Sequence, residues 1–560
     1  MKIKDPIHGY IEIDKEIVVN IVDTAEFQRL REVRQTNYDG LYPGSLHNRF
    51  THSLGVYFLG KKTSNSFFKD LELNFSREFE ESKTLLEKIE LSYCMACLLH
   101  DVGHAPFSHS CEKNYLDNKI DDIYNLDNHT TSFISLYNEL YEKVCEYSGY
   151  NANNFNNSFY LDYKNILHSD ALFKPHEAMS AIIGMESFNE YLKDKIDFEL
   201  FTRCIIGCLY EDNSTFINGV KNCLIKMLNS PIVDVDKLDY LMRDMKMTGF
   251  LSSSIDLDRL LDSFCLIEDD GNYCFGFKKN VLSALMNVLI TSDNEKKWIQ
   301  SHPVIIYESY LFDKCIEEIK NIYGNNIFTK QALSIDGIGL NGNDKIRLLS
   351  DSDVLYLLKK IDNDKFFIKE FFSRKDRKKP VWKNEVEFNI IFNEFNETLR
   401  NKMIELFTTK TGNEDIKEVI NLSRINDELI EKIKKELESQ SGEYSNRRKK
   451  FEKYLFWCNN FKNFCKENDI EFEIINIQVK NFVSSFEQLQ KVNPLIKFPS
   501  VDTKRQLTKI DSIYIQSNNK YQSSIYFYLY ISKNDDSHLN KKFVKFFKET
   551  AEKFQKEFNL

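Results

Sequence analysis

The residues best suited to chemistry lie in one stretch, Leu91–Glu112, which reads LSYCMACLLHDVGHAPFSHSCE. Apolar residues recur there at helical spacing as far as Leu99, and a glycine and a proline then end the pattern. His100 and Asp101 are therefore expected side by side at a helix end. Imidazoles beside a carboxylate offer metal ligands and proton carriers within one small volume. The other histidines of this stretch are His104 and His109.

Two further histidines stand at predicted helix starts. His52 follows the Pro43–Gly44 turn, and Arg49 is close to it in sequence. A helix N-terminus with an arginine nearby is a favourable place for phosphate. His176 begins another apolar helical pattern. Taken singly, His52 would more often cap a helix or lie in a core, so the case depends on the rest of the chain.

A second informative stretch spans residues 230–250, with the sequence SPIVDVDKLDYLMRDMKMTGF. Asp234 is a plausible N-cap, and Gly249 is a fitting C-terminal stop. The polar side chains expected on one face are Asp236, Lys237, Tyr240 and Asp244. Together they could bind a metal, a phosphate and a sugar. The alternative is a solvated polar face with ordinary i,i+4 charge pairs.

The chain that must position these residues is long and acidic. Its 560 residues can bury a large core and favour two lobes. A net charge of −10 argues against bulk nucleic-acid binding. Twelve scattered cysteines and a start without a signal peptide favour a reducing cytoplasm. No apolar run is long enough to cross a bilayer.

The expected fold class is mainly α: a helical core with small β-hairpins, followed by a C-terminal α+β lobe. Hairpins are predicted at Lys4–Ile13 and Phe264–Phe277. We assign 1–330 to the core, and we interpret the polar stretch at 113–170 as an insertion. Residues 331–560 form a lobe with a regulatory or oligomerisation role. That lobe is expected to hold helices at 353–375 and 395–438, strands at 472–479 and 525–531, and a last helix from residue 540.

Five strings in order resemble the HD-domain phosphohydrolases. Within them, the chain is similar to the dNTP triphosphohydrolases, both the bacterial dGTPase-like enzymes and the vertebrate sterile-alpha-motif and HD-domain dNTPase. The strings are DPIHG, DTxxFQRLR, PGxxHNRFxHSLGV, LLHDVGHAPFSH and DVDKLDYLMRD, and they span most of residues 1–250. The resemblance implies a helical HD core acting as a metal-dependent dNTP triphosphohydrolase.

The resemblance also implies roles for individual residues. The implied metal ligands are His52, His100, Asp101 and Asp236. The implied catalytic group is His176, with His104 and His109 facing the α-phosphate and Glu112 standing where relatives have an aspartate. The implied substrate contacts are Arg49 and Lys237 for phosphate, with Gln35, Tyr240 and Asp244 for sugar and base. The ion would be one divalent transition metal such as Fe, Mn or Zn, with Mg as a possible companion of the nucleotide.

Relatives that a guanine nucleotide activates use three polar residues of the DTxxFQRLR string, and this chain matches them with Asp23, Gln28 and Arg31. The match implies an effector site and a homo-oligomer, a dimer or a tetramer. The alternative is that these polar residues cap a surface helix and form ordinary ion pairs on it. An ungapped alignment around His302 places Ser292 and Gln300 where the vertebrate enzyme has a phosphate-binding Arg and a sugar-stacking Tyr. The resemblance therefore leaves open whether this chain discriminates between deoxyribose and ribose.

Three functions remain after these arguments. The first is hydrolysis of a dNTP to a deoxynucleoside and triphosphate, in nucleotide-pool control or in dNTP depletion during phage infection. The second is an HD-type phosphodiesterase or nucleotidase acting on another phosphate ester. The third is a nucleotide sensor with a vestigial metal site. The products separate them, since only the first releases triphosphate.

Overall fold

The structure is a computed structural model, and it describes most of the 560 residues. The described ranges are 1–112, 114, 135–152, 157–167, 173–250, 255–324, 327–340, 344–361, 365–408, 423–439, 446–479, 484–498, 503–506, 525–532 and 538–559. The predicted insertion at 113–170 therefore lies partly outside the described residues. What is described of it includes two helices, α7 (Ser135–Ser148) and α8 (Ser158–Leu167).

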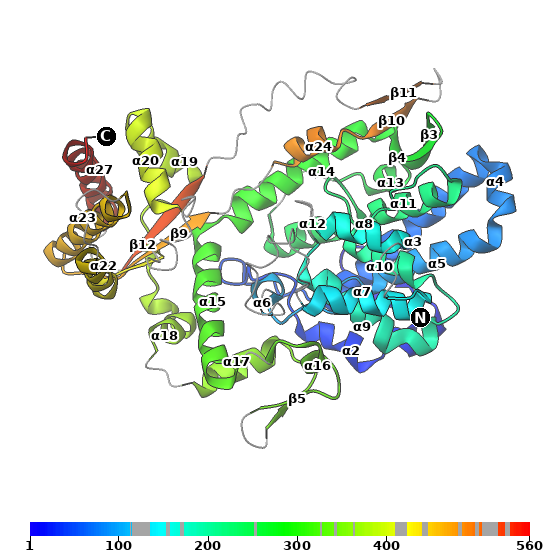
Figure 1. The fold of residues 1–560 in the computed structure, drawn as a ribbon, viewed down its shortest axis with the longest axis horizontal. Helices are drawn as coiled ribbons and strands as arrows, with labels where there is room; N and C mark the ends of the chain where they lie inside the picture. The colour runs from blue at the N-terminus through cyan, green and yellow to red at the C-terminus, as the bar shows by residue number, and fades with distance from the viewer. Residues whose placement is uncertain are drawn as a thin grey trace. The chain divides into compact units, whose positions relative to one another are not determined.

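The chain divides into two compact units that interleave along the sequence. The first comprises Met1–Glu295, Ile316–Ile361 and Ser484–Tyr521, and the second comprises Lys296–Cys315, Asp362–Val483 and Gln522–Leu560. The functional division at residue 330 stays a prediction. Helices dominate the described residues, so the predicted mainly α fold class is confirmed (Figure 1).

The first unit is built around long buried helices. Helix α3 (Arg49–Asn74) packs against α5 (Lys83–Leu99) and α12 (Val235–Thr248), and α10 (Phe198–Ile206) packs against α5 and α9 (Pro175–Leu192). The further helices of this unit are α1 (Lys15–Ile17), α2 (Ala25–Gln28), α4 (Ser76–Glu81), α6 (His109–Glu112), α11 (Phe216–Leu228), α13 (Leu257–Leu261), α14 (Leu282–Asn294), α16 (Lys330–Leu333), α17 (Asp351–Lys360) and α24 (Ser485–Val492). The packing of these helices fixes the positions of the ends of α3, α5 and α12, which carry candidate site residues.

Both predicted hairpins are present in the first unit. Strands β1 (Lys2–Asp5) and β2 (Gly9–Glu12) pair antiparallel. Strands β3 (Phe264–Asp269) and β4 (Asn272–Lys278) form the second hairpin, which β10 (Leu495–Phe498) and β11 (Thr503–Gln506) extend to four strands. Strand β10 runs parallel to β4, a pairing that no hairpin signal could predict. A short pair, β5 (Ile338–Gly339) and β6 (Lys345–Ile346), completes the described sheets of this unit.

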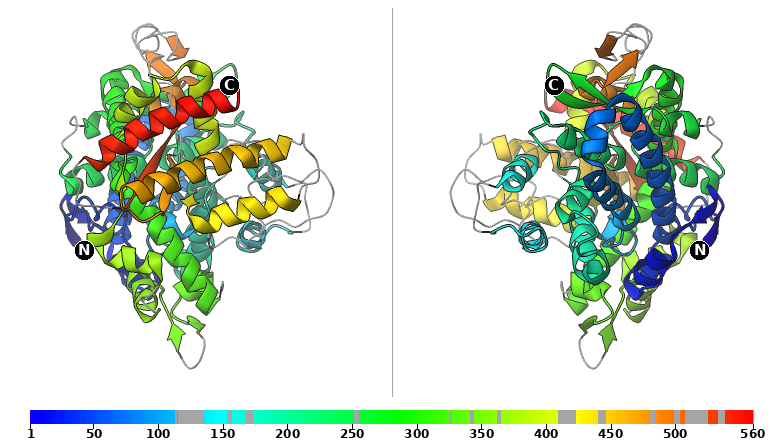
Figure 2. Two further views of the ribbon diagram at one scale, coloured as in Figure 1. Left: turned by 90° about the vertical axis from the view of Figure 1, so that its left-hand side faces the viewer. Right: turned by 90° about the vertical axis from the view of Figure 1, so that its right-hand side faces the viewer.

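The second unit combines a small sheet with helices. Its strand order is β7–β12–β9–β8, from β7 (Lys379–Pro380), β12 (Tyr526–Ile531), β9 (Ile474–Val479) and β8 (Arg424–Ile425). Its helices are α18 (Phe366–Phe372), α19 (Glu385–Phe392), α20 (Glu397–Phe407), α22 (Asp427–Ser439), α23 (Asn446–Glu467) and α27 (Leu539–Glu557). Helices α22 and α23 lie side by side (Figure 2). Helix α15 (Pro303–Tyr323) begins in this unit.

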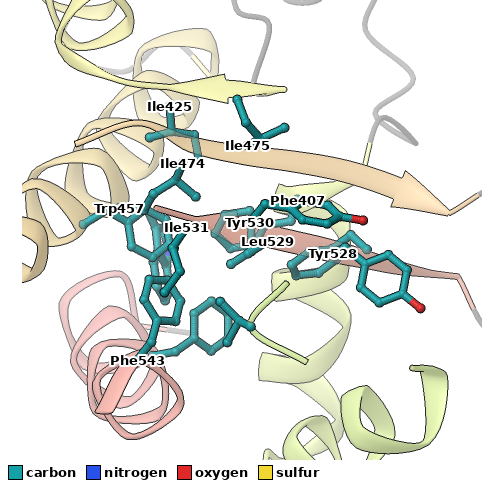
Figure 3. Close-up of a cluster of buried hydrophobic side chains, with 14 of the residues drawn as sticks. Phe407, Ile425, Trp457, Ile474, Ile475, Tyr528, Leu529, Tyr530, Ile531 and Phe543 are labelled. Carbon is teal, nitrogen blue, oxygen red and sulfur yellow. The ribbon is translucent and has the colours of Figure 1, made fainter. Parts of the chain in front are cut away.

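Aromatic side chains dominate the core of the second unit. Trp457 on α23 contacts Phe407 and Phe547, and strand β12 is buried along its whole length (Figure 3). Such rings bury large apolar areas and favour offset or edge contacts. The unit therefore has a core of its own, as the α+β expectation for the C-terminal part required.

None of the described helices combines the length and the apolar character needed to cross a bilayer. Cys94 and Cys97 are free thiols and sit one helical turn apart inside the buried part of α5.

Candidate metal centre and active site

Helix ends carry the four predicted metal ligands. Helix α5 stops at Leu99, so His100 and Asp101 follow its last turn, as predicted. His52 lies in the first turn of α3, whose N-cap Asn48 accepts a hydrogen bond from the backbone of Thr51 at 3.1 Å. Asp236 lies in the first turn of α12. The predicted caps of α12 are both present: Asp234 accepts from the Lys237 backbone at 2.6 Å, and Gly249 adopts φ +70°.

Four side-chain atoms from these ends converge. Nε2 of His52 and Nε2 of His100 lie 3.3 Å apart, and Oδ2 of Asp101 lies 3.6 Å from each. Oδ1 of Asp236 lies 3.0 Å from Nε2 of His52 and 3.8 Å from Nε2 of His100. Ligands about 2.1 Å from a common ion sit roughly 3.0–3.4 Å from one another. The atoms of His52, His100 and Asp101 all lie within 4.8 Å of one another and could hold one cation, whereas Asp236 stands outside that group and contacts it through the two histidines.

The rings of both histidines are held by their other nitrogen. Nδ1 of His100 donates to the carbonyl oxygen of Cys97 at 2.9 Å, and Nδ1 of His52 donates to Oδ2 of Asp239 at 2.7 Å. A histidine that donates from Nδ1 presents a lone pair on Nε2, which is how metal-binding histidines are usually oriented. Both Nε2 atoms therefore face the centre, in the orientation that a metal requires.

The charges at the centre also suit a cation. Burial opposes ionisation of Asp101, but Arg49 outweighs it and holds the pKa of this carboxyl well below its usual value. For Asp236, a hydrogen bond from His52 overcomes burial and lowers the pKa to about 2. Burial disfavours charge on His52, yet its bonds to Asp236 and Asp239 raise its pKa to about 9. A divalent ion would take the place of that proton.

Arg49, predicted as a phosphate ligand, contacts the centre directly. Its Nη1 donates to Oδ2 of Asp101 at 2.7 Å, and its Nε donates to Oγ of Ser108 at 2.9 Å. Arg49 is 4% exposed. The arginine therefore neutralises one of the two acids at the centre.

A second cluster combines three imidazoles with one carboxylate. Oε2 of Glu112 accepts from Nδ1 of His176 at 2.5 Å and lies 3.2 Å from Nδ1 of His109. The rings of His104 and His176 are stacked, with centroids 4.2 Å apart. These four could also hold a cation, but stacked rings do not readily direct lone pairs at one ion, and the carboxylate–imidazole pair is the arrangement of a proton carrier.

His104 joins the two clusters. Its Nε2 lies 3.9 Å from Oδ1 of Asp101, while the other oxygen of this carboxylate faces His52 and His100. Its side chain is fully buried, and neither ring nitrogen has a hydrogen-bond partner among the described residues. An orphaned buried polar group calls for an explanation, and a bound ligand is one.

The loop that carries His104 and His109 is held by residues distant in sequence. Phe107 and Ser108 adopt φ values of +53° and +52°, a costly conformation for side chains other than glycine. Oδ1 of Asp351 accepts from the Phe107 backbone at 2.6 Å. Nη2 of Arg29 donates to the carbonyl oxygen of His104 at 2.9 Å. These bonds keep the loop in its strained form.

A pocket of about 390 Å³ opens beside the centre. The candidate site residues that line it are His100, His176, Asp236, Lys237 and Tyr240. Lys174 and Lys226 add positive charge, and Ile205, Ile206 and Leu228 add apolar surface. The volume falls in the usual range for small-molecule sites. In the structure, Nζ of Lys237 donates to the carbonyl oxygens of Ser230, Pro231 and Ile232 at 3.1–3.3 Å.

Three predicted substrate residues do not line this pocket: Arg49, which pairs with Asp101, and also Asp244 and Gln35. Asp244 accepts from, or donates to, Nε2 of His47 at 2.6 Å, and burial raises its pKa to about 7. Gln35 is 6% exposed, and its Oε1 has no hydrogen-bond partner among the described residues. The face predicted for α12 is thus split, with Asp236, Lys237 and Tyr240 at the pocket and Asp244 beside His47.

The predicted effector residues surround helix α2. Nε2 of Gln28 donates to the Val22 carbonyl at 2.7 Å, and its Oε1 accepts from Nε of Arg31 at 2.7 Å. The guanidinium of Arg31 also lies over the ring of Phe50 at 3.6 Å. Asp23 is exposed at the end of the turn that precedes α2. Gln28 and Arg31 therefore contact each other, and their effector role stays a prediction.

Sequence reasoning missed the support behind His52. Asp239 contacts His52, Arg243 and His8, and the last of these lies 231 positions away. A signal was present, because Asp239 follows Asp236 by three positions on one helix and His8 belongs to the DPIHG string. That Asp239 supports His52 could be seen only in the three-dimensional structure.

Comparisons with known proteins agree with this geometry. Residues 49–146 match the model of the HD domain family. The chain is 26% identical over 365 residues to the uncharacterized protein MJ1154 of Methanocaldococcus jannaschii, covering 64% of this chain and 57% of that protein. It is 24% identical over 329 residues to the uncharacterized protein YwfO of Bacillus subtilis, covering 58% of each. The match thus spans less than two thirds of these relatives.

A more similar but shorter match covers the HD region. The chain is 42% identical over 117 residues to deoxynucleoside triphosphate triphosphohydrolase SAMHD1 of Homo sapiens, covering 20% of this chain and 17% of that protein. Among solved structures, a hypothetical protein from Aquifex aeolicus has a TM-score of 0.50 at 16% identity, covering 98% of this chain and 99% of the other. That likeness concerns the fold alone. With the HD match at residues 49–146 and the converging ligands, it follows that the chain contains an HD domain, the domain of metal-dependent phosphohydrolases.

Proposed function

We propose that this protein is a dNTP triphosphohydrolase, which cleaves the bond between the α-phosphorus and O5′ and releases a deoxynucleoside and triphosphate. The observation that carries the proposal is the convergence of His52, His100 and Asp101, with Asp236 against His52, next to the His176–Glu112 pair and a pocket of about 390 Å³. The HD-region similarity to an enzyme named for this activity supports the same substrate class.

In this proposal, the four converging side chains hold one divalent transition metal. Two imidazoles and two carboxylates suit Fe, Mn or Zn better than Ca. When bound, such an ion neutralises phosphate charge and makes a nearby water more acidic. Arg49, already paired with Asp101, adds a guanidinium that can stabilise negative charge on phosphorus-bound oxygens.

His176 is the proposed proton donor. Water adds to the α-phosphorus, the bond to O5′ breaks, and the departing oxygen needs a proton. Because Nδ1 of His176 is held by Glu112, Nε2 is the nitrogen that can give this proton. Glu112 orients the ring and stabilises its charged form. His104 stacks on His176 and restricts its rotation, while Lys237 lies at the wall of the pocket for the phosphates.

Nucleotide activation is a further part of the proposal. Asp23, Gln28 and Arg31 form the candidate effector site, within a homo-oligomer. Relatives activated in this way resemble the chain at these three positions, and the Gln28–Arg31 hydrogen bond holds two of them together.

The test is a product analysis. The metal-loaded protein is incubated with each dNTP alone and in pairs, and nucleosides are separated from phosphates. We expect a deoxynucleoside and triphosphate in equal amounts, with an Asp101→Asn variant inactive and an exposed Glu81→Gln variant unchanged. Activity seen only in pairs would support the effector site. Release of orthophosphate or pyrophosphate, or binding without turnover, would contradict the proposed reaction.

A further inference from the structure

A buried network behind His52 is more elaborate than holding one ring requires. The carboxylate of Asp239 has four hydrogen-bond contacts: His52 at 2.7 Å, His8 at 2.6 Å, and Nε and Nη2 of Arg243, each at 2.9 Å. An ionised carboxylate has about four acceptor positions, so all of them are used. Because the carboxylate can only accept, His52 must donate from Nδ1, which leaves Nε2 for the metal.

The network extends to the N-terminal turn. Oδ1 of Asp5 accepts from the backbone of Ile7 at 2.8 Å and of His8 at 2.9 Å, which makes the turn between β1 and β2 rigid. Oδ2 of the same residue accepts from Nη1 of Arg243 at 2.9 Å. The turn is thus fixed to α12 through Asp5 and Arg243 and, separately, through His8 and Asp239.

The network is fully enclosed. The side chains of Asp239, Arg243 and His52 have 0% exposure, and those of Asp5 and His8 have 3% and 2%. Buried charges are costly unless they are paired, and here Arg243 lies between the two carboxylates. In such surroundings a lost partner leaves another group unsatisfied, so the geometry at one end of the network depends on the other.

Helix α3 leaves room for this arrangement at one position. A methyl group added at Gly55 would lie 2.0 Å from Oδ1 of Asp239 and 2.6 Å from Nη2 of Arg243. Glycine inside a helix costs about 0.5–1 kcal/mol relative to alanine. Glycine favours a helix less than any residue except proline. It nevertheless stands where Asp239 meets the helix that carries His52.

We propose that the N-terminal turn is part of the metal centre: His8 fixes the Asp239 carboxylate, and Asp239 in turn holds His52 with Nε2 directed at the ion. His8 and Asp239 are positioning residues, not ligands. The inference rests on the metal site of the proposed function, but not on the identity of the phosphate ester. It assigns the first ten residues of the chain a role in metal affinity.

The experiment measures the affinity of the full-length protein for Mn²⁺ by titration against a fluorescent chelator. Loss of an outer partner of a ligating histidine typically weakens metal binding by about 10–100-fold, and we expect Asp239→Asn to fall in that range. His8→Ala acts one step further away and should weaken binding by roughly tenfold. His8→Gln, whose amide can donate to the same oxygen, should restore most of the affinity. Tyr10→Ala, an exposed change on the same hairpin, should bind as wild type does.

A second readout separates positioning from general stability. Co²⁺ replaces Mn²⁺, and its visible absorption reports ligand number and geometry. We expect His8→Ala and Gly55→Ala to change this spectrum and to speed metal loss to a chelator, with His8→Gln close to wild type. Wild-type Mn²⁺ affinity and an unchanged Co²⁺ spectrum in both His8→Ala and Asp239→Asn would overturn the inference while leaving the proposed function standing. A wild-type protein that binds no divalent ion would overturn both. The expected graded loss of metal, in a protein that leaves every dNTP intact, would support the inference and contradict only the proposed substrate.

Discussion

The exchange Glu112→Gln tests the proposed chemistry most directly. The side chain keeps its length and an oxygen that can accept the Nδ1–H of His176, but it loses the negative charge. Burial opposes that charge in the native protein, and hydrogen bonds from His109 and His176 outweigh burial, so the pKa of Glu112 lies below its usual value. Glu112 is therefore ionised at neutral pH, and the exchange removes a charge that is present during turnover.

The expected loss follows from the geometry of the pair. Oε2 and Nδ1 are 2.5 Å apart, and the two delocalised charges are centred further apart. At about 4 Å and an effective dielectric constant of about 20, the attraction is about 4 kcal/mol. The retained hydrogen bond offsets about 1 kcal/mol of this. Since each 1.4 kcal/mol is about tenfold in rate, we expect turnover of a dNTP to fall by roughly 10²-fold.

The assay compares two leaving groups. The 5′ alkoxide of a nucleoside needs a proton as it leaves, whereas the phenolate of 4-nitrophenyl triphosphate does not. Glu112→Gln should therefore slow the dNTP by roughly 10²-fold and the nitrophenyl ester by much less. Glu112→Asp, which keeps the carboxylate, should lie between wild type and Glu112→Gln. Glu81→Gln, an exposed glutamate change on α4, serves as the matched control.

Two results would refute this reasoning. Equal losses with both substrates would show that Glu112 acts on folding or substrate binding and has no part in proton delivery. Unchanged turnover of the dNTP would remove the His176–Glu112 pair from the mechanism. Metal content is measured in each variant, because a variant that has lost its ion cannot be compared with the wild type.

Four further outcomes are expected. His176→Ala should keep its metal and lose at least about 10²-fold in turnover, with His538→Ala as the control and equal turnover in both as the contrary result. Removal of the ion by a chelator should abolish hydrolysis, and Mn²⁺ or Fe²⁺ should restore it; activity that survives complete removal would contradict the metal requirement. Burial raises the pKa of Asp351 to about 6, so the folded protein takes up a proton between about pH 4 and pH 6 that the unfolded chain does not. The contribution of Asp351 to stability should thus be greatest below pH 4 and fall by up to about 3 kcal/mol as the pH rises to 6, and the difference in urea midpoint between wild type and Asp351→Asn should change with pH in that sense; a constant difference would be contrary. Trp457→Ala should destabilise the second unit by about 3–5 kcal/mol and leave Mn²⁺ affinity unchanged, whereas a parallel loss of metal would show that the units are coupled.

Helix boundaries near the centre could be predicted because their signals are local. The end of α5 at Leu99, the N-cap Asp234 and the C-terminal Gly249 all follow from residues within a few positions of the boundary. The convergence of His52 with His100, by contrast, was expected only from the resemblance to a family. Nothing in the spacing of 48 positions brings two imidazoles to 3.3 Å.

Contacts between distant buried polar groups could not be predicted. Arg49 was expected to face phosphate, and in the structure it pairs with Asp101. Asp244 was placed on the polar face of α12 by its spacing, yet it lies against His47, a partner 197 positions away. A helical period fixes the direction of a side chain only roughly, and which partner satisfies a buried polar group depends on the whole packing.

The two metal-site histidines differ in their support because they lie at opposite ends of helices. The last four carbonyls of a helix lack intrahelical partners, and Cys97 is among them in α5, so His100 at the end of that helix finds its acceptor locally. The first turn of a helix offers unpaired N–H groups and no free carbonyl, and His52 lies in the first turn of α3. Its Nδ1–H must therefore find an acceptor on another element, which is Asp239 of α12. A carboxylate buried there needs partners of its own, and Arg243 and His8 provide them. The direction of the two helices thus explains why His52 has a long-range network behind it. It also explains why, among the described residues, His100 has none.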